Sequence, residues 1–179
     1  LSCSQDGYIF KWEMNEDCSA LVEATRFKDE TSNLVFSIDI VPGCGSAYFV
    51  ASTDDAIKVY DFEAGWILQS FPATSYFTSY VDHVLFVPGT GTDPGEEGRT
   101  LRLLARGVED VSGEDNQTVQ PNTVRILNLT IPSEDGYGGW SLTLERTLGH
   151  PEYMGNAWPV RLCATRSTVY SPTADGCFF

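Results

Sequence analysis

Short apolar runs rich in valine, isoleucine, phenylalanine, tyrosine and threonine alternate along this chain with clusters of glycine, proline, aspartate and serine. This spacing is typical of short β-strands joined by turns, whereas helical periodicity is hard to find. The clearest stretch is residues 35–71, where the pattern predicts strands at residues 35–41, 48–52, 57–61 and 66–71. We therefore expect an all-β protein built from antiparallel four-stranded units.

A recurring motif sets the spacing of these units. Residues 4–12 align with residues 52–60, and the start of the motif returns at residues 173–179. Each copy has a hydroxyl residue, a variable residue, an aspartate and a small residue before an apolar-alternating strand. The hydroxyl residues are Ser4, Ser52 and Thr173, and the aspartates are Asp6, Asp54 and Asp175. The first two aspartates lie 48 positions apart, close to the roughly 40–45 residues of a WD40 unit.

The repeat resembles the WD40 family over nearly the whole chain. In that family a blade ends in Trp-Asp, is preceded by Gly-His and carries an aspartate in the turn between its second and third strands. Tyr60-Asp61 matches the Trp-Asp pair with tyrosine substituted, Trp12 matches its tryptophan, and Gly149-His150 matches Gly-His. The resemblance implies structural roles, in a buried network of aspartate, histidine, hydroxyl and tryptophan side chains, for Ser4, Asp6, Trp12, Ser52, Asp54, Tyr60, Asp61, His150, Thr173 and Asp175.

The same resemblance divides the chain into blades of one WD40-type β-propeller. We expect a partial blade at residues 1–30, a blade at 34–72, a blade at 79–148 and a partial blade at 149–179. The third of these carries an inserted loop at residues 108–122, which is either disordered or a binding element. Joining the two ends would leave a ring of about three blades, fewer than the four to eight that close. We therefore expect the remainder of the propeller, or neighbouring chains, against both ends.

The charge balance narrows the range of partners. Lysine plus arginine number 11 and aspartate plus glutamate number 25, so the net charge is −14. This argues against direct binding of nucleic acid or an anionic membrane, because both attract basic surfaces. It favours basic peptides as partners, although solubility alone also explains acidic loops.

The cysteines and the N-glycosylation sequons indicate in which cellular compartment the protein is expected. The five cysteines form no CxxC pair, and an odd number fits a reducing compartment better than a disulfide framework. We therefore expect an intracellular protein of the nucleus or cytoplasm. The sequons at Asn116 and Asn128 would matter only in the alternative of a secreted or cell-surface propeller.

No motif in the sequence predicts a catalytic site, a metal site or a cofactor. The two histidines, His83 and His150, lie in no nucleophile or metal-ligand pattern, and the glycine-rich residues 89–95 are not followed by Gly-Lys-Ser/Thr. The function predicted is a non-catalytic protein-interaction scaffold, a WD40 propeller subunit of an intracellular multiprotein complex. The alternatives are an enzyme on a propeller framework and the secreted propeller. We expect other protein subunits or basic peptides to bind through inter-blade loops, at the candidate residues Tyr76, Phe77, Tyr153, Thr53 and Gln5.

Overall fold

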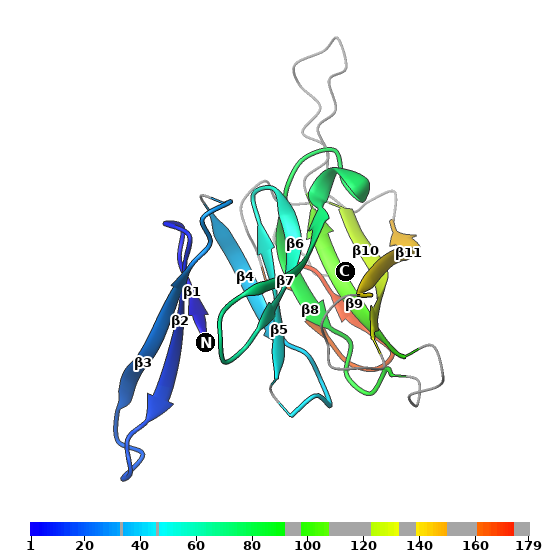
Figure 1. Cartoon of the computed structure of the whole chain (residues 1–179). Helices are drawn as coiled ribbons and strands as arrows, with labels where there is room; N and C mark the ends of the chain where they lie inside the picture. Colours follow the sequence, from blue (N-terminus) through cyan, green and yellow to red (C-terminus); the bar gives the residue numbers. More distant parts are fainter. Residues whose placement is uncertain are drawn as a thin grey trace.

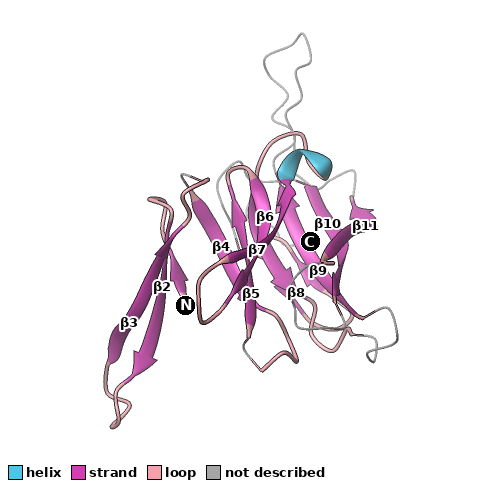
Figure 2. Cartoon of the chain, in the orientation of Figure 1, coloured by secondary structure: helices cyan, strands magenta, loops and turns pink. Residues whose placement is uncertain are grey.

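The computed structural model describes residues 1–32, 34–45, 47–91, 98–107, 123–132, 139–149 and 161–173. Within these ranges the chain forms antiparallel β-strands and one 3₁₀ turn, η1 (Ala73–Ser75), with no α-helix (Figures 1 and 2). The prediction of an all-β protein is confirmed. No helix in the described part of the chain is long and apolar enough to cross a membrane.

The strands form four sheets, which we name A to D in chain order. Sheet A contains β1 (Ser2–Cys3), β2 (Tyr8–Met14) and β3 (Leu21–Lys28). Sheet B contains β4 (Val35–Ile40), β5 (Tyr48–Thr53), β6 (Ala56–Asp61) and β7 (Ile67–Pro72). Sheet C contains β8 (Val81–Phe86), β9 (Arg99–Gly107), β10 (Thr123–Ile131) and β11 (Ser141–Leu148). Sheet D contains β12 (Cys163–Ala164) and β13 (Val169–Tyr170).

In sheets B and C each strand pairs with the next strand along the chain, as expected of blade-like units. The four predicted strands of residues 35–71 correspond to β4–β7 within about one residue at each end. The central strands β5 and β6 are buried on both faces, because sheet B lies between sheets A and C. Within sheet B, the rings of Phe49 and Tyr60 face each other across β5 and β6 and stack with centroids 4.8 Å apart.

The core is divided among the interfaces between successive sheets. Ile9 of sheet A packs with Phe49 and Tyr60 of sheet B. The opposite face of sheet B packs against sheet C through a larger cluster that includes Val50, Val59, Leu103 and Leu127. A third, smaller cluster joins sheets C and D. Hydrophobic burial between sheets therefore supplies the main stabilisation of the arrangement.

Side chains of β4 also bind the backbone of β8. Ser37 Oγ accepts a hydrogen bond from the Val84 N–H at 2.7 Å, and Asp39 Oδ2 accepts one from the Phe86 N–H at 2.7 Å. Ser37 Oγ in turn lies 2.9 Å from Ser52 Oγ on β5. Because β8 is an edge strand of sheet C, these bonds satisfy N–H groups that no strand of its own sheet reaches.

Candidate functional site

A buried ionic network joins the connection after β3 to sheet B. Lys58 and Tyr60, two residues apart on β6, project to the same side and both reach Asp29. Lys58 Nζ donates to Asp29 Oδ2 at 2.9 Å and to Thr31 Oγ1 at 2.8 Å, and Tyr60 Oη donates to Asp29 Oδ2 at 2.6 Å. The Lys58 and Asp29 side chains are almost completely inaccessible to solvent. The network therefore links sheets A and B through charge as well as through apolar contact.

The protonation states in this network follow from its contacts. Burial raises the pKa of Asp29, but hydrogen bonds from Tyr60, Lys58 and Thr31 outweigh it and set the value at about 2. Burial and the Asp29 carboxylate raise the pKa of Tyr60 far above its ordinary value. Asp29 is therefore an anion and Tyr60 a neutral donor at neutral pH.

The turn between β5 and β6 completes the network through Asp55. Asp55 Oδ1 accepts a hydrogen bond from Thr53 Oγ1 at 2.6 Å, lies 3.0 Å from Lys58 Nζ and also accepts a hydrogen bond from Ser32. Asp54, the turn aspartate of the WD40 resemblance, instead accepts a hydrogen bond from the Leu34 N–H at 3.4 Å. The aspartate that contacts Lys58 is therefore Asp55, one residue after the turn aspartate of the motif.

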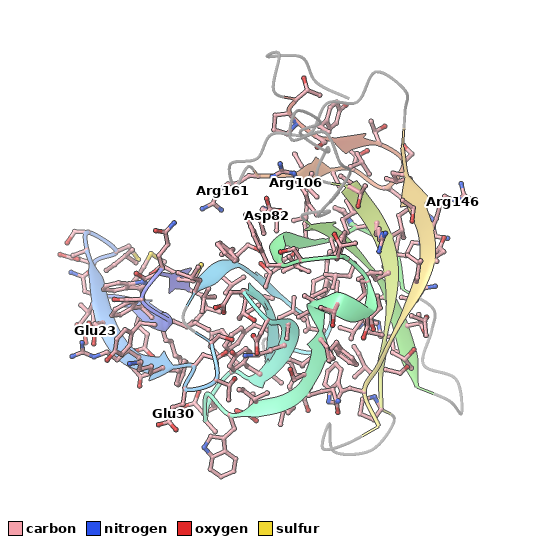
Figure 3. The ribbon with its side chains drawn as sticks, turned by 90° about the horizontal axis from the view of Figure 1, so that it is seen from above. Glu23, Glu30, Asp82, Arg106, Arg146 and Arg161 are labelled. Carbon is pink, nitrogen blue, oxygen red and sulfur yellow. The ribbon has the colours of Figure 1, made fainter. Side chains whose placement is uncertain are left out.

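A second charged cluster lies on sheet C near its first strand. Arg106 Nη1 donates to Asp82 Oδ2 at 2.6 Å, and both side chains are at most 1% exposed. His83 is buried beside them, and among the described residues its Nδ1 has no hydrogen-bond partner. Burial, with the cations Arg161 and Arg106, lowers the pKa of His83 to about 4, so its imidazole is neutral at pH 7. Figure 3 shows Arg161 and Arg106 on the same side of the sheets.

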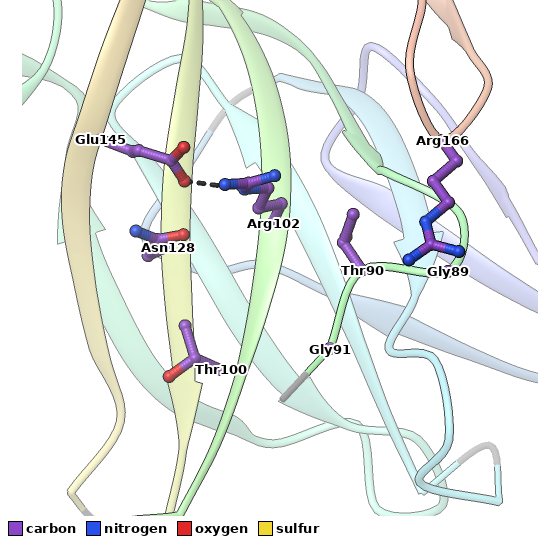
Figure 4. A pocket seen from close by; sticks show the side chains of 8 residues that line it. All are labelled: Gly89, Thr90, Gly91, Thr100, Arg102, Asn128, Glu145 and Arg166. Carbon is purple, nitrogen blue, oxygen red and sulfur yellow. Dashed lines mark hydrogen bonds and ion pairs between the residues drawn. The ribbon is translucent and has the colours of Figure 1, made fainter. Parts of the chain in front are cut away.

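A polar pocket of about 520 Å³ opens on the face of sheet C that is turned toward sheet D (Figure 4). It is lined by Gly89, Thr90 and Gly91 after β8, Thr100 and Arg102 on β9, Asn128 on β10, Glu145 on β11 and Arg166 between β12 and β13. Arg102 Nε donates to Glu145 Oε2 at 2.9 Å. The pocket therefore gathers residues that are up to 77 positions apart, and nothing in the local sequence pattern predicts it.

A fourth feature is the exposed end of the β2–β3 hairpin. Met14 and Leu21 face each other as the last pair of these strands, and Val22 pairs with Glu13. Met14, Leu21 and Val22 are 66%, 64% and 53% exposed, which is high for large apolar side chains. The sequence carries a signal for this cluster, since apolar residues flank the acidic turn at residues 15–19.

The candidate binding residues that the structure describes do not form one surface. Phe77 is only 3% exposed, and its ring lies beneath the guanidinium of Arg125 at 4.7 Å. Thr53 is fully buried and bonded to Asp55. Tyr76 is half-buried and donates to the Leu142 carbonyl at 2.8 Å. Assigning Phe77 and Thr53 to a partner surface is therefore corrected, because both side chains serve packing within the chain.

Gln5 is exposed in the turn between β1 and β2. Tyr153, His150 and Asp175 lie outside the described residues.

The remaining motif residues make local contacts. Asp6 Oδ1 accepts a hydrogen bond from the Tyr8 N–H at 3.2 Å, and hydrogen bonds from Ser4 and this backbone amide lower the pKa of Asp6. Trp12 Nε1 donates to Ser2 Oγ at 2.8 Å. Asp61 Oδ1 accepts hydrogen bonds from two backbone amides of the following turn. Thr173 is buried at the end of the described chain. These contacts fix turns and strand pairs and bring no reactive groups together.

Comparison of the chain with protein-family models, with curated proteins and with solved structures gave no match. Among the described residues no three potential histidine, cysteine or carboxylate ligands cluster as a metal site would require.

Proposed function

We propose that this chain is a non-catalytic protein-interaction scaffold of WD40 type, within an intracellular complex of the nucleus or cytoplasm. The stacked sheets of four strands and the WD40-like motifs support the framework. The cysteines of the described part, Cys3, Cys18, Cys44 and Cys163, are free thiols, which suits a reducing compartment. The resemblance of fold does not by itself assign a function, so the proposal depends on a binding surface.

The observation that carries the proposal is the exposed hairpin end, which we name the hairpin tip and define as residues 13–24. It combines the three exposed apolar side chains with four carboxylates, those of Glu13, Glu16, Asp17 and Glu23, and contains no lysine or arginine. Figure 1 shows the turn of this hairpin extending away from the other sheets. Exposed apolar residues bordered by charge are typical of protein interaction sites.

The partner that fits the hairpin tip is a basic, apolar segment of another protein. Its lysine or arginine side chains would pair with the carboxylates of Glu13, Glu16 and Asp17, since Glu23 is already paired with Arg26. Its apolar side chains would cover Met14 and Leu21, which share one face of the hairpin. Strand β3 is the edge of sheet A among the described strands, so its outer backbone groups are positioned to pair with an added strand. The segment therefore binds in an extended conformation along β3.

A fluorescent peptide of alternating lysine and valine tests this proposal by fluorescence anisotropy. We expect binding that weakens as salt is added, because the charges at the tip are exposed and screened. The double substitution Met14→Ser with Leu21→Ser should weaken binding about tenfold, equivalent to about 1.4 kcal/mol. The matched control is Leu144→Ser on β11, where the side chain is 50% exposed but lies in sheet C.

Two control peptides separate the contribution of charge from that of backbone pairing with β3. A peptide of alternating glutamate and valine should not bind, because its charge matches that of the tip. The lysine peptide with alternate N-methylated amides should bind weakly, because it cannot pair with β3. Equal binding to the hairpin variant and to the Leu144 control would refute the hairpin tip as the interaction surface.

A further inference from the structure

The face of sheet C that is turned toward sheet D is divided into an apolar and a polar half. In the apolar half, Leu104 and Val124 pack against Leu162. In the polar half, Arg102 and Asn128 are cross-strand neighbours, as are Thr100 and Thr130. Because residues two apart on a strand share a face, these side chains form one continuous polar surface.

The corresponding face of sheet B is closed by sheet C, and its polar side chains Ser37 and Asp39 are hydrogen-bonded to β8. The side chains that it turns toward sheet C include Val50, Ile57 and Val59, all buried in the main core cluster. In sheet C, by contrast, the side chain of Arg102 is 50% exposed and the polar half stays open as a pocket. An open pocket with several polar groups is expected of a binding site rather than of a packing surface.

The groups in the pocket are mainly hydrogen-bond donors. Glu145 binds Nε of Arg102, which leaves the terminal guanidinium nitrogens of Arg102 available to the pocket. In the described part of the chain, no hydrogen bond or ion pair joins the Arg166 guanidinium or the Asn128 amide to another residue. Two guanidinium groups and one carboxylate give the lining a net charge of +1, whereas the whole chain carries −14.

We propose that this pocket binds a small polar molecule through one oxyanion group, either a carboxylate or a phosphate. Arg166 pairs with the oxyanion through its planar donor pair, and Arg102, which Glu145 holds in position on the other side of Thr90 (Figure 4), binds another part of the ligand. The Asn128 amide and the Thr90 hydroxyl provide hydrogen bonds to the remaining polar groups of the ligand. The volume of about 520 Å³ is within the range of small-molecule sites.

Isothermal titration calorimetry with four probes tests the proposal and identifies the oxyanion. The probes are glucose 6-phosphate, glucuronate, inorganic phosphate and, as the uncharged control, glucose. We expect at least one of the charged sugars to bind with a Kd below about 1 mM and glucose not to bind. Binding of glucose 6-phosphate alone assigns a phosphate, and binding of glucuronate alone assigns a carboxylate. Inorganic phosphate should bind more weakly than glucose 6-phosphate if the sugar hydroxyls are also held.

Variants of Arg166 test whether the ligand binds in this pocket. Arg166→Gln should weaken binding at least tenfold, and Arg166→Lys should retain part of it, because lysine keeps the charge and loses the planar donor pair. Arg26→Gln on β3 is the matched control, since Arg26 is also exposed but lies in sheet A. Thermal unfolding should be unchanged in Arg166→Gln, since its side chain is exposed. No binding of either charged sugar, or equal affinity of Arg166→Gln and Arg26→Gln, would overturn the proposal.

Discussion

Lys58 Nζ lies 2.9 Å from Asp29 Oδ2, and neither side chain is more than 1% exposed. The two residues are 29 positions apart and connect β6 with the segment that leaves β3. Taking two charges out of water is costly, and the pair persists because Tyr60 and Thr31 also bind the Asp29 carboxylate. The contact between sheets A and B thus combines the apolar cluster around Ile9 with a buried ion pair whose charges are mutually compensated.

Removing one charge of this pair should destabilise the fold strongly. We expect Lys58→Met to lower the free energy of unfolding by about 3–5 kcal/mol, because Asp29 is left as an unpaired buried anion. Urea unfolding followed by circular dichroism measures the loss. The matched control is Lys11→Met, whose partner Glu63 is 87% exposed, and it should cost no more than about 1 kcal/mol. The double variant with Asp29→Asn and Lys58→Met should be more stable than Lys58→Met alone, because the unpaired anion is gone. If the losses in the free energy of unfolding of the two single variants simply add in the double variant, Lys58 and Asp29 are not energetically coupled.

Acid should weaken the network in a defined pH range. The pKa of Asp29 is about 2 in the folded chain against an ordinary value of 3.8. The stabilisation is therefore complete above pH 3.8 and is lost as the pH falls toward 2. Across this range the wild type should lose about 2 kcal/mol more than Asp29→Asn, which has no carboxylate to protonate. Parallel curves of stability against pH for the two proteins would exclude this role for Asp29.

Protonation of His83 should lower the stability of the fold in a higher pH range than protonation of Asp29 does. Its folded pKa of about 4 is below the ordinary 6.5, so the unfolded chain binds the proton more tightly. Stability should therefore fall as the pH decreases from 6.5 to 4, by up to about 3 kcal/mol. His83→Gln should show a flatter profile in this range, whereas Asp29→Asn should keep the wild-type slope there. Equilibrium denaturation at closely spaced pH values distinguishes these two outcomes.

Ser37 should be needed for the contact between β4 of sheet B and β8 of sheet C. Ser37→Ala removes the acceptor of the Val84 N–H and leaves that buried donor unsatisfied. The expected cost is about 1–3 kcal/mol, accompanied by faster hydrogen exchange of the Val84 amide. Ser70→Ala, on the exposed side of β7, should change stability by no more than about 0.5 kcal/mol. Unchanged exchange at Val84 would show that this hydrogen bond does not hold β8 against β4.

The strands of sheet B could be predicted closely because their signals are local. Alternating apolar residues end at Pro42 and Gly43, and Asp54 and Asp55 mark the next turn, so each strand is bounded within a few residues. The long strands β9 and β10 have a weaker local signal, because no copy of the recurring motif falls within them. Among the candidate functional features, only the hairpin tip can be recognised in the sequence. Its apolar residues and its acidic turn are close together along the chain.

The sequence by itself determined that this chain forms short antiparallel strands and where most of the turns lie, because side-chain alternation and turn residues act over a few positions. Only the tertiary structure decided which side chains those strands bury. It placed Phe77 and Thr53 in the interior, paired Lys58 with Asp29, and selected Asp55 over Asp54 for the network. It also brought Arg102 and Arg166 to one pocket. Such contacts depend on which faces of different sheets meet, and that relation has no counterpart in the local pattern of the chain.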